Sequence, residues 1–220
     1  MTGYALREGL SFCRTGDRFV FLDLHSDRYF CLSPNLDRAL LAVVEGARGS
    51  ASGKNLRPLI RDGILREIAA DERLLTCIAP AAPRVSLIEQ PAKVSSASIL
   101  GALSRRLLWR GWVATRPLGQ ILTEFKRRKQ STDAPAPPPA ALIRLAAAHH
   151  RAGLIVSAYD QCLSTSLAIA SALLKSGASP DIVLGVKLHP FQAHCWVQIG
   201  DAVANDRPET VRLFTPILVV

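Results

Sequence analysis

A thiol, an imidazole and a carboxylate occur in that order in the C-terminal third of the chain, each within a segment of clear local pattern. Cys162 stands where a helix is expected to begin, His194 lies in an apolar strand-like run, and Asp206 follows twelve residues later. A thiol needs a base to become a thiolate, and the base needs an acceptor that holds its ring. The chain must therefore bring a helix start to a strand pair, an arrangement typical of cysteine peptidases and acyltransferases.

The spacing of the histidine and the acid fits an antiparallel hairpin. If residues 191–198 pair with residues 202–206 across a three-residue loop that contains a glycine, His194 lies opposite Asp206. Opposed side chains lie about 5 Å apart at Cβ, so a carboxylate reaches an imidazole N–H. Asp201 is the alternative acid, but it falls in the turn, several residues away. We therefore predict Asp206 as the acceptor.

Helix placement favours Cys162 over the other cysteines as the nucleophile. Apolar residues recur at helical spacing after it until Gly177, the expected C-cap, and Asp160 is the expected N-cap. The first-turn N–H groups would stabilise a thiolate and could hold an oxyanion. Cys195 adjoins His194, but alternate strand residues face opposite ways, so its thiol should point away from the site.

Each of the three residues also has a purely structural interpretation. A buried cysteine is commonly a small core residue, and a strand histidine is commonly a satisfied interior residue. Asp206, before Arg207 and Pro208, could open a turn. Only the combination of all three, in compatible local structure, indicates catalysis.

The C-terminal part, from about residue 142 to 220, resembles the transglutaminase-like leader peptidases of lasso-peptide biosynthesis, often called B proteins. The resemblance rests on Cys162 and Leu163 opening an aliphatic helix, on the runs 183–186 (VLGV) and 191–197 (FQAHCWV), and on the following aspartate.

This resemblance implies a papain/transglutaminase-like cysteine peptidase domain with Cys162, His194 and Asp206 as its catalytic triad. Two positions depart from the family pattern: Thr165 stands where a basic residue is common, and Gln198 where an acid is common. Both departures bear on substrate details and not on the triad. No metal-ligand motif is present, and no cofactor is expected.

The first 80 residues predict a separate, small winged-helix-like α+β module. Two short apolar and aromatic runs indicate a hairpin, and Ser33 followed by Pro34 indicates a helix start. The expected segments are strands at 18–24 and 27–32, a loop at 46–53, a helix at 56–61 and a return toward the sheet at 63–65.

This module resembles the PqqD-like precursor-recognition element of ribosomal-peptide pathways. The resemblance rests on the runs 20–24 (VFLDL), 28–34 (RYFCLSP) and 62–65 (DGIL). It implies that a leader peptide adds as an extra strand to an exposed sheet edge. A generic DNA-binding winged helix is the alternative interpretation of the same pattern. The residues expected to bind the leader peptide are Asp27, Arg28, Tyr29, Phe30, Cys31, Leu32, Leu56 and Ile60.

The positive charge is concentrated in the middle of the chain. The formal net charge is +9, and residues 91–139 hold nine basic and two acidic side chains. Leucines and tryptophans alternate with the basic residues at 103–129, which predicts a basic amphipathic helix that packs on the second domain. The alternative is a surface for a partner or an acidic precursor.

The expected organisation is α+β with two domains: 1–80 for leader recognition and 91–220 for peptidase chemistry. Residues 81–90 are the expected linker, and residues 131–139 are an expected Pro-rich loop. Five cysteines without paired spacing argue against a disulfide framework and favour a reducing, cytoplasmic location. Neither a signal peptide nor a membrane-inserted segment is expected.

Together these resemblances predict a leader peptidase that binds a lasso precursor and hydrolyses the bond between leader and core. They imply the precursor peptide and an ATP-dependent, asparagine-synthetase-like cyclase as partners, and no nucleic acid. Two alternatives stay open: an amine acyltransferase that uses the same triad, and a winged-helix DNA-binding regulator with a degenerate C-terminal domain.

Overall fold

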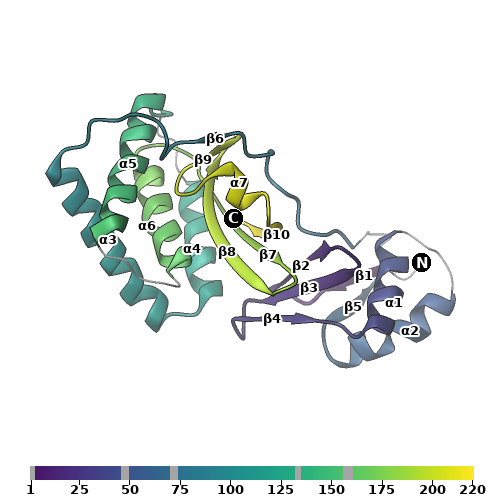
Figure 1. The fold of residues 1–220 in the computed structure, drawn as a ribbon. Coiled ribbons are helices and arrows are strands. Elements are labelled where there is room, and N and C mark those ends of the chain that lie inside the picture. The colour runs from purple at the N-terminus through teal and green to yellow at the C-terminus, as the bar shows by residue number, and fades with distance from the viewer. Residues whose placement is uncertain (1–2, 46–49, 70–73, 132–134, 156–160) are drawn as a thin grey trace. The chain divides into compact units, whose positions relative to one another are not determined.

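The computed structural model describes residues 3–45, 50–69, 74–131, 135–155 and 161–220 (Figure 1). The chain divides into two compact units, Met1–Ile78 and Ala79–Val220. None of the helices in the described ranges combines the length and the apolar character needed to cross a bilayer.

The first unit contains a three-stranded antiparallel sheet. β2 (Leu10–Thr15), β3 (Arg18–Asp23) and β4 (Arg28–Cys31) follow one another in space as in sequence. The rings of Phe12, Phe21 and Phe30 occupy paired positions and stack across the three strands, with centroids 5.5 and 5.1 Å apart. Cross-strand aromatic pairs of this kind help to fix the register. The expected β3–β4 hairpin is confirmed, and β2 adds a strand that the sequence analysis missed.

Two helices follow this sheet. α1 (Pro34–Val44) begins where predicted, with Ser33 as an extended N-cap and proline in the first turn. Asp37 in that turn is buried, and it accepts hydrogen bonds from the Arg18 guanidinium at 2.6 Å and the Phe19 N–H at 3.3 Å. These bonds attach α1 to β3.

The second helix, α2 (Ser50–Arg61), is longer than the predicted segment 56–61 and takes up the end of the expected loop 46–53. Leu56, which was expected to bind the leader peptide, is fully buried in the hydrophobic core, and Ile60 packs against that core. The face of α2 that carries Leu56 is therefore used to close the unit, so Leu56 is not available for direct contact with a peptide.

The chain ends of the first unit form a second, two-stranded sheet. β1 (Gly3–Leu6) pairs antiparallel with β5 (Leu65–Ile68). The chain was expected to return at residues 63–65 to the sheet that contains the β3–β4 hairpin. It does form a strand after this point, but that strand pairs with β1.

The second unit is built on a five-stranded sheet with the order β10-β7-β8-β9-β6. All neighbours are antiparallel except β6 and β9, which are parallel. β6 lies within residues 81–90, which the sequence analysis assigned to a linker, so part of this segment belongs to the sheet. The strands are β6 (Val85–Ser86), β7 (Asp181–Lys187), β8 (Gln192–Ile199), β9 (Ala202–Val203) and β10 (Thr215–Val219).

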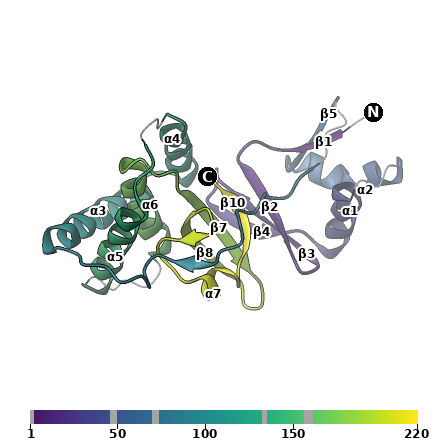
Figure 2. The same ribbon diagram turned by 90° about the horizontal axis from the view of Figure 1, so that it is seen from above.

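Helices cover one side of this sheet (Figures 1 and 2). α6 (Cys162–Lys175) packs directly on β7 and β8, and α3 (Ser96–Thr115) and α5 (Pro139–Ile155) pack on α6. α6 is buried along most of its length, as a helix between a sheet and other helices must be. A short helix, α7 (Pro208–Val211), precedes β10.

The basic stretch 103–129 is not one helix. α3 ends at Thr115 and α4 (Leu118–Gln130) begins after Pro117. Arg116 is extended, with φ −128° and ψ 141°, which is the conformation that a following proline favours. The prediction of a single amphipathic helix is wrong at this point because proline interrupts the apolar pattern.

Candidate active site

The structure brings His194 and Asp206 into direct contact. The His194 Nε2–H donates to Asp206 Oδ2 at 2.6 Å. The other carboxylate oxygen, Oδ1, accepts from the Arg207 N–H at 2.7 Å, and the Thr210 side chain is also hydrogen-bonded to the carboxylate. Ser86 Oγ on β6 donates to the Asp206 carbonyl at 2.9 Å. The acid is thus fixed at both its backbone and its side chain.

The hairpin that produces this contact differs from the predicted one. Ile199 pairs with Ala202 across a two-residue turn, and the register would place residue 207, not Asp206, opposite His194. Gly200 has φ 59° at the first turn position, where type II′ turns favour glycine. The predicted three-residue loop is therefore wrong. The contact forms because β9 ends at Val203 and the chain then bends away from the regular ladder.

An asparagine holds the chain in this bent path. Asn205 Oδ1 accepts from the Val197 N–H at 2.8 Å, and its Nδ2 donates to Ser166 Oγ at 2.9 Å. Ser166 Oγ in turn donates to the Cys195 carbonyl at 2.8 Å. This chain of bonds connects α6, β8 and the segment that carries Asp206. Asn205 and Ser166 are positioning residues that sequence reasoning missed, because their partners are known only once the fold is known.

Cys162 is the first residue of α6. Gln161 is the N-cap, and its carboxamide oxygen, in the orientation that satisfies both partners, accepts from Arg110 Nε at 3.1 Å and Nη1 at 3.0 Å. Asp160, the predicted N-cap, lies outside the described residues. Cys162 therefore stands at the positive end of the helix dipole, as expected, and α3 holds the residue before it. At the other end, Gly177 follows the Ser176 C-cap with φ 91°, as a C′ glycine does.

The surroundings of His194 favour its protonated form. Burial, the largest influence, lowers the pKa of the imidazole, but hydrogen bonds to Asp206 and Cys162 and the charges of these two groups together raise it to about 9. Burial likewise raises the pKa of Asp206, and its hydrogen bonds, chiefly to His194, outweigh this and lower the pKa below its usual value. Since Nε2 faces Asp206, Nδ1 is the ring nitrogen left for the Cys162 thiol.

Two aromatic rings and a glycine surround the imidazole of His194. His194 lies opposite Gly185 on β7, and its ring lies 5.0 Å from the Phe214 ring and 6.1 Å from the Trp196 ring. A Cβ at Gly185 would come within 2.6 Å of the Trp196 ring. The glycine thus lets Trp196 pack flat beside the imidazole.

Two of the other described thiols, Cys195 and Cys13, are poor nucleophiles. Cys195 is buried, and burial raises its pKa to about 12; burial also raises the pKa of Cys13 to about 11. Cys31 and Cys77 belong to the first unit. Cys162 is the thiol that the structure brings to a histidine and a carboxylate. Across the described ranges, no group of three or more side chains is suited to hold a metal ion.

The raised pKa of His194 predicts an alkaline limit to activity. A raised pKa means that the imidazolium persists at neutral pH and is lost as the pH rises through about 9. We expect kcat/KM to fall above this pH. In Asp206→Asn, the loss of the carboxylate should move the titration of the His194 ring to lower pH, which NMR of its Cε1–H would measure. A ring that titrates at the same pH in both proteins would contradict the assigned coupling.

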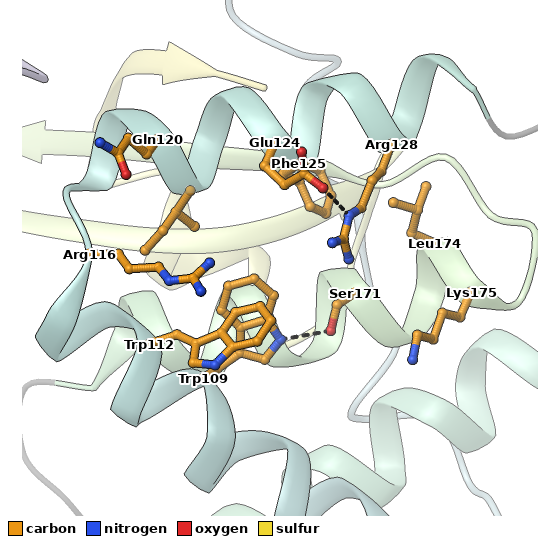
Figure 3. Close-up of a pocket in the computed structure, with 11 residues that line it drawn as sticks. Trp109, Trp112, Arg116, Gln120, Glu124, Phe125, Arg128, Ser171, Leu174 and Lys175 are labelled. Atoms are coloured by element: carbon orange, nitrogen blue, oxygen red, sulfur yellow. Dashed lines mark hydrogen bonds and ion pairs between the residues drawn. The ribbon is translucent and has the colours of Figure 1, made fainter.

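A separate pocket of about 340 Å³ lies between α3, α4 and the C-terminal half of α6 (Figure 3). Trp109 Nε1 donates to Ser171 Oγ at 3.0 Å in its wall, and the Arg116 guanidinium lies 4.7 Å from the centre of the Trp112 ring. None of Cys162, His194 and Asp206 lines it, and Ser171, its lining residue on α6 nearest to Cys162, lies about 14 Å along the helix from Cys162 at 1.5 Å per residue. This pocket is therefore distinct from the triad.

The residues expected to bind a leader peptide lie in the first unit. Residues 28–31 form β4, an edge strand of the three-stranded sheet, with Asp27 before it at φ 52° and the buried Leu32 after it. Arg28 and Cys31 are exposed, whereas Tyr29 and Phe30 are partly buried. The edge position of β4 fits strand addition, whereas Leu56 is buried in the core.

Comparisons with known proteins agree with the geometry of the second unit. A family profile described as "Transglutaminase-like superfamily" matches residues 99–219, which include Cys162, His194 and Asp206. A 49-residue stretch is 38% identical to the "Microcin J25-processing protein McjB" of Escherichia coli. It covers 22% of this chain and 24% of that protein, so the match spans about a quarter of the relative's length. No solved structure matches the chain. Because this family match covers more than half of the residues of the chain, the chain belongs to the transglutaminase-like superfamily.

Proposed function

We propose that this protein is a cysteine leader peptidase that processes a ribosomally made lasso-peptide precursor. The contact of His194 with Asp206 and of His194 with Cys162, inside a transglutaminase-like domain, is the observation that carries the proposal. The partial similarity to a microcin-processing protein supports the substrate class.

The chemistry follows from the positions of the three side chains. His194 holds the proton of the Cys162 thiol, and the thiolate attacks the carbonyl of the leader–core peptide bond. The N–H groups of the first turn of α6 are placed to bind the oxyanion of the tetrahedral intermediate. His194 then donates its proton to the leaving amine, and the core peptide departs. Water hydrolyses the thioester that links the leader to Cys162.

The test is incubation of the full chain with the peptide encoded by the short reading frame expected beside its gene. Mass spectrometry should detect two products: the leader with a free carboxylate and the core with a free amine. By resemblance to the family, a separate ATP-dependent cyclase then joins this amine to an acidic side chain. If the precursor stays intact after incubation with this protein, and also after incubation with this protein and the cyclase together, the proposed activity is contradicted.

An amine acyltransferase is the second candidate, because the superfamily includes both cysteine peptidases and acyltransferases. Both reactions pass through the same thioester and differ only in whether water or an amine receives the acyl group. Adding a simple primary amine to the incubation separates them. A peptidase gives mainly the leader carboxylate, whereas an acyltransferase gives mainly the leader amide.

Leader recognition is assigned to the edge strand β4, and a proline tests it. Tyr29→Pro removes a backbone N–H and constrains the strand, so we expect leader affinity to fall about tenfold or more. Tyr29→Val keeps the N–H and is the matched control, with near wild-type affinity. Fluorescence anisotropy with a labelled leader and, separately, with a labelled DNA duplex measures the affinity of each variant for each ligand. Duplex binding without leader binding would favour the regulator and contradict this assignment.

A further inference from the structure

A pocket of about 560 Å³ lies between α3 and α5, and no residue of the triad lines it. Its size is that of a site for a small organic molecule. Three basic side chains and no acidic one line it. The basic residues are Lys93 before α3, Arg105 on α3 and Arg144 on α5.

Within the described part of the chain, these three cations have no counter-ion. Among the ion pairs formed by the described residues, none includes Lys93, Arg105 or Arg144. By contrast, two basic residues of α4, Arg127 and Arg128, both pair with Glu124. Positive charge in the α3–α5 pocket is therefore concentrated and unbalanced, which raises the local concentration of anions.

A buried histidine lines the same pocket. The His149 side chain is 2% exposed, and neither of its ring nitrogens has a hydrogen-bond partner in the described part of the chain. Burial, together with the charges of Arg105 and Arg106, lowers its pKa to about 3, so the ring is neutral and keeps one N–H donor. Buried polar groups are almost always paired, so an N–H in this position indicates a polar group that binds there.

The start of α3 adds further donors. Ser95, the N-cap of this 20-residue helix, and Ser98 in its first turn both line the pocket. Their hydroxyl groups are 2.9 Å apart, and Ser95 Oγ accepts from the Ser98 N–H. The N-terminal end of a helix carries partial positive charge and favours anions. The helix end thus adds to the effect of the three cations and the histidine.

We infer that this pocket binds a small organic anion that carries phosphate or carboxylate groups. The two arginines present planar forks of N–H donors that match the oxygens of either group, and Lys93 adds a point charge. The His149 N–H donates from the buried wall of the pocket. This site is independent of the triad and of the proposed peptidase function.

Isothermal titration calorimetry on the full chain at constant ionic strength tests the inference with two probes, inorganic pyrophosphate and citrate. We expect saturable one-to-one binding of at least one of them. Arg105→Gln and Arg144→Gln should each weaken it by about tenfold or more, the effect of losing a charge-assisted hydrogen-bond pair. Arg66→Gln on β5 is the control with the same loss of charge, and it should bind as the wild type does.

NMR of the His149 ring distinguishes binding inside the pocket from general attraction of anions to the charged surface. The bound probe should shift the ring ¹⁵N resonances of His149 in the wild-type protein. Pyrophosphate alone would identify phosphate as the recognised group, citrate alone would identify carboxylate, and both would show general oxyanion binding. Binding that is unsaturable, that is unaffected by both arginine substitutions or that leaves His149 unshifted would overturn the inference. A hexaglutamate peptide serves as an additional comparison. If it binds and neither pyrophosphate nor citrate does, the inference is also overturned, in favour of a macromolecular partner.

Discussion

Replacing Cys162 with alanine is expected to abolish leader release while leaving precursor binding unchanged. Without the thiol no acyl-enzyme forms, so kcat should fall by about a thousandfold or more. Cys162 is the first residue of α6 and is only partly buried, so the truncation should leave the fold intact. Quantitative mass spectrometry of the leader and core products measures the rate, and anisotropy with a labelled precursor measures the binding.

Cys195→Ala is the control for this change. Cys195 is the neighbour of His194 in sequence, but its thiol is buried and its pKa is raised to about 12 by burial. We expect this variant to retain most of the activity. Cleavage by Cys162→Ala at a near wild-type rate, or loss of activity in Cys195→Ala alone, would show that the nucleophile is misassigned.

Replacing Asp206 with asparagine should reduce turnover by about a hundred- to ten-thousandfold. An amide can still accept the hydrogen bond from the Arg207 N–H, so the local fold should survive. However, an amide can hold the imidazole in the wrong tautomer, and it has no charge to stabilise the imidazolium. The quantity to measure is kcat for precursor cleavage, with circular dichroism to verify folding.

Asp201 supplies the matched control, since it is the other acid of the same hairpin. It lies in the two-residue turn, it is exposed, and its carbonyl accepts from Arg84 and Val85 through the backbone alone. Asp201→Asn should therefore change kcat little. The reverse ranking of the two variants would contradict the pairing of Asp206 with His194.

Local signals in the sequence predicted several elements well. Ser33 and Pro34 indicated the start of α1, and the apolar period after Cys162 with Gly177 at its end indicated α6. These signals act within a few residues, through capping and through the helical repeat, so they can be recognised without knowledge of the fold.

Other elements were missed or misjudged for identifiable reasons. The dipeptide Gly-Asp at residues 16–17 and again at 200–201 forms a two-residue hairpin turn, and a glycine at the first position is a signal for it. Recognising this signal would have found β2 and the correct register of β8 and β9. Pro117 is a second missed signal, because a proline marks the boundary between α3 and α4.

The contacts that position the site could not be predicted from local patterns. Ser86 lies 120 residues before Asp206, and Asn205 lies 39 residues after Ser166. Their hydrogen bonds exist only because β6 joins the sheet beside β9 and α6 packs on β8. Likewise, Leu56 was expected to bind the leader peptide, and only tertiary packing shows that it lies in the core.

The central claim is that Cys162 attacks the precursor and is held ready by His194 and Asp206. Its most direct test is intact-mass spectrometry of the full chain, quenched in acid within the first turnover on its precursor. The proposed chemistry predicts a protein whose mass has increased by that of the leader acyl group, with peptide mapping placing the thioester on Cys162. Release of the core without any covalent adduct, at a rate that Cys162→Ala leaves unchanged, would contradict it.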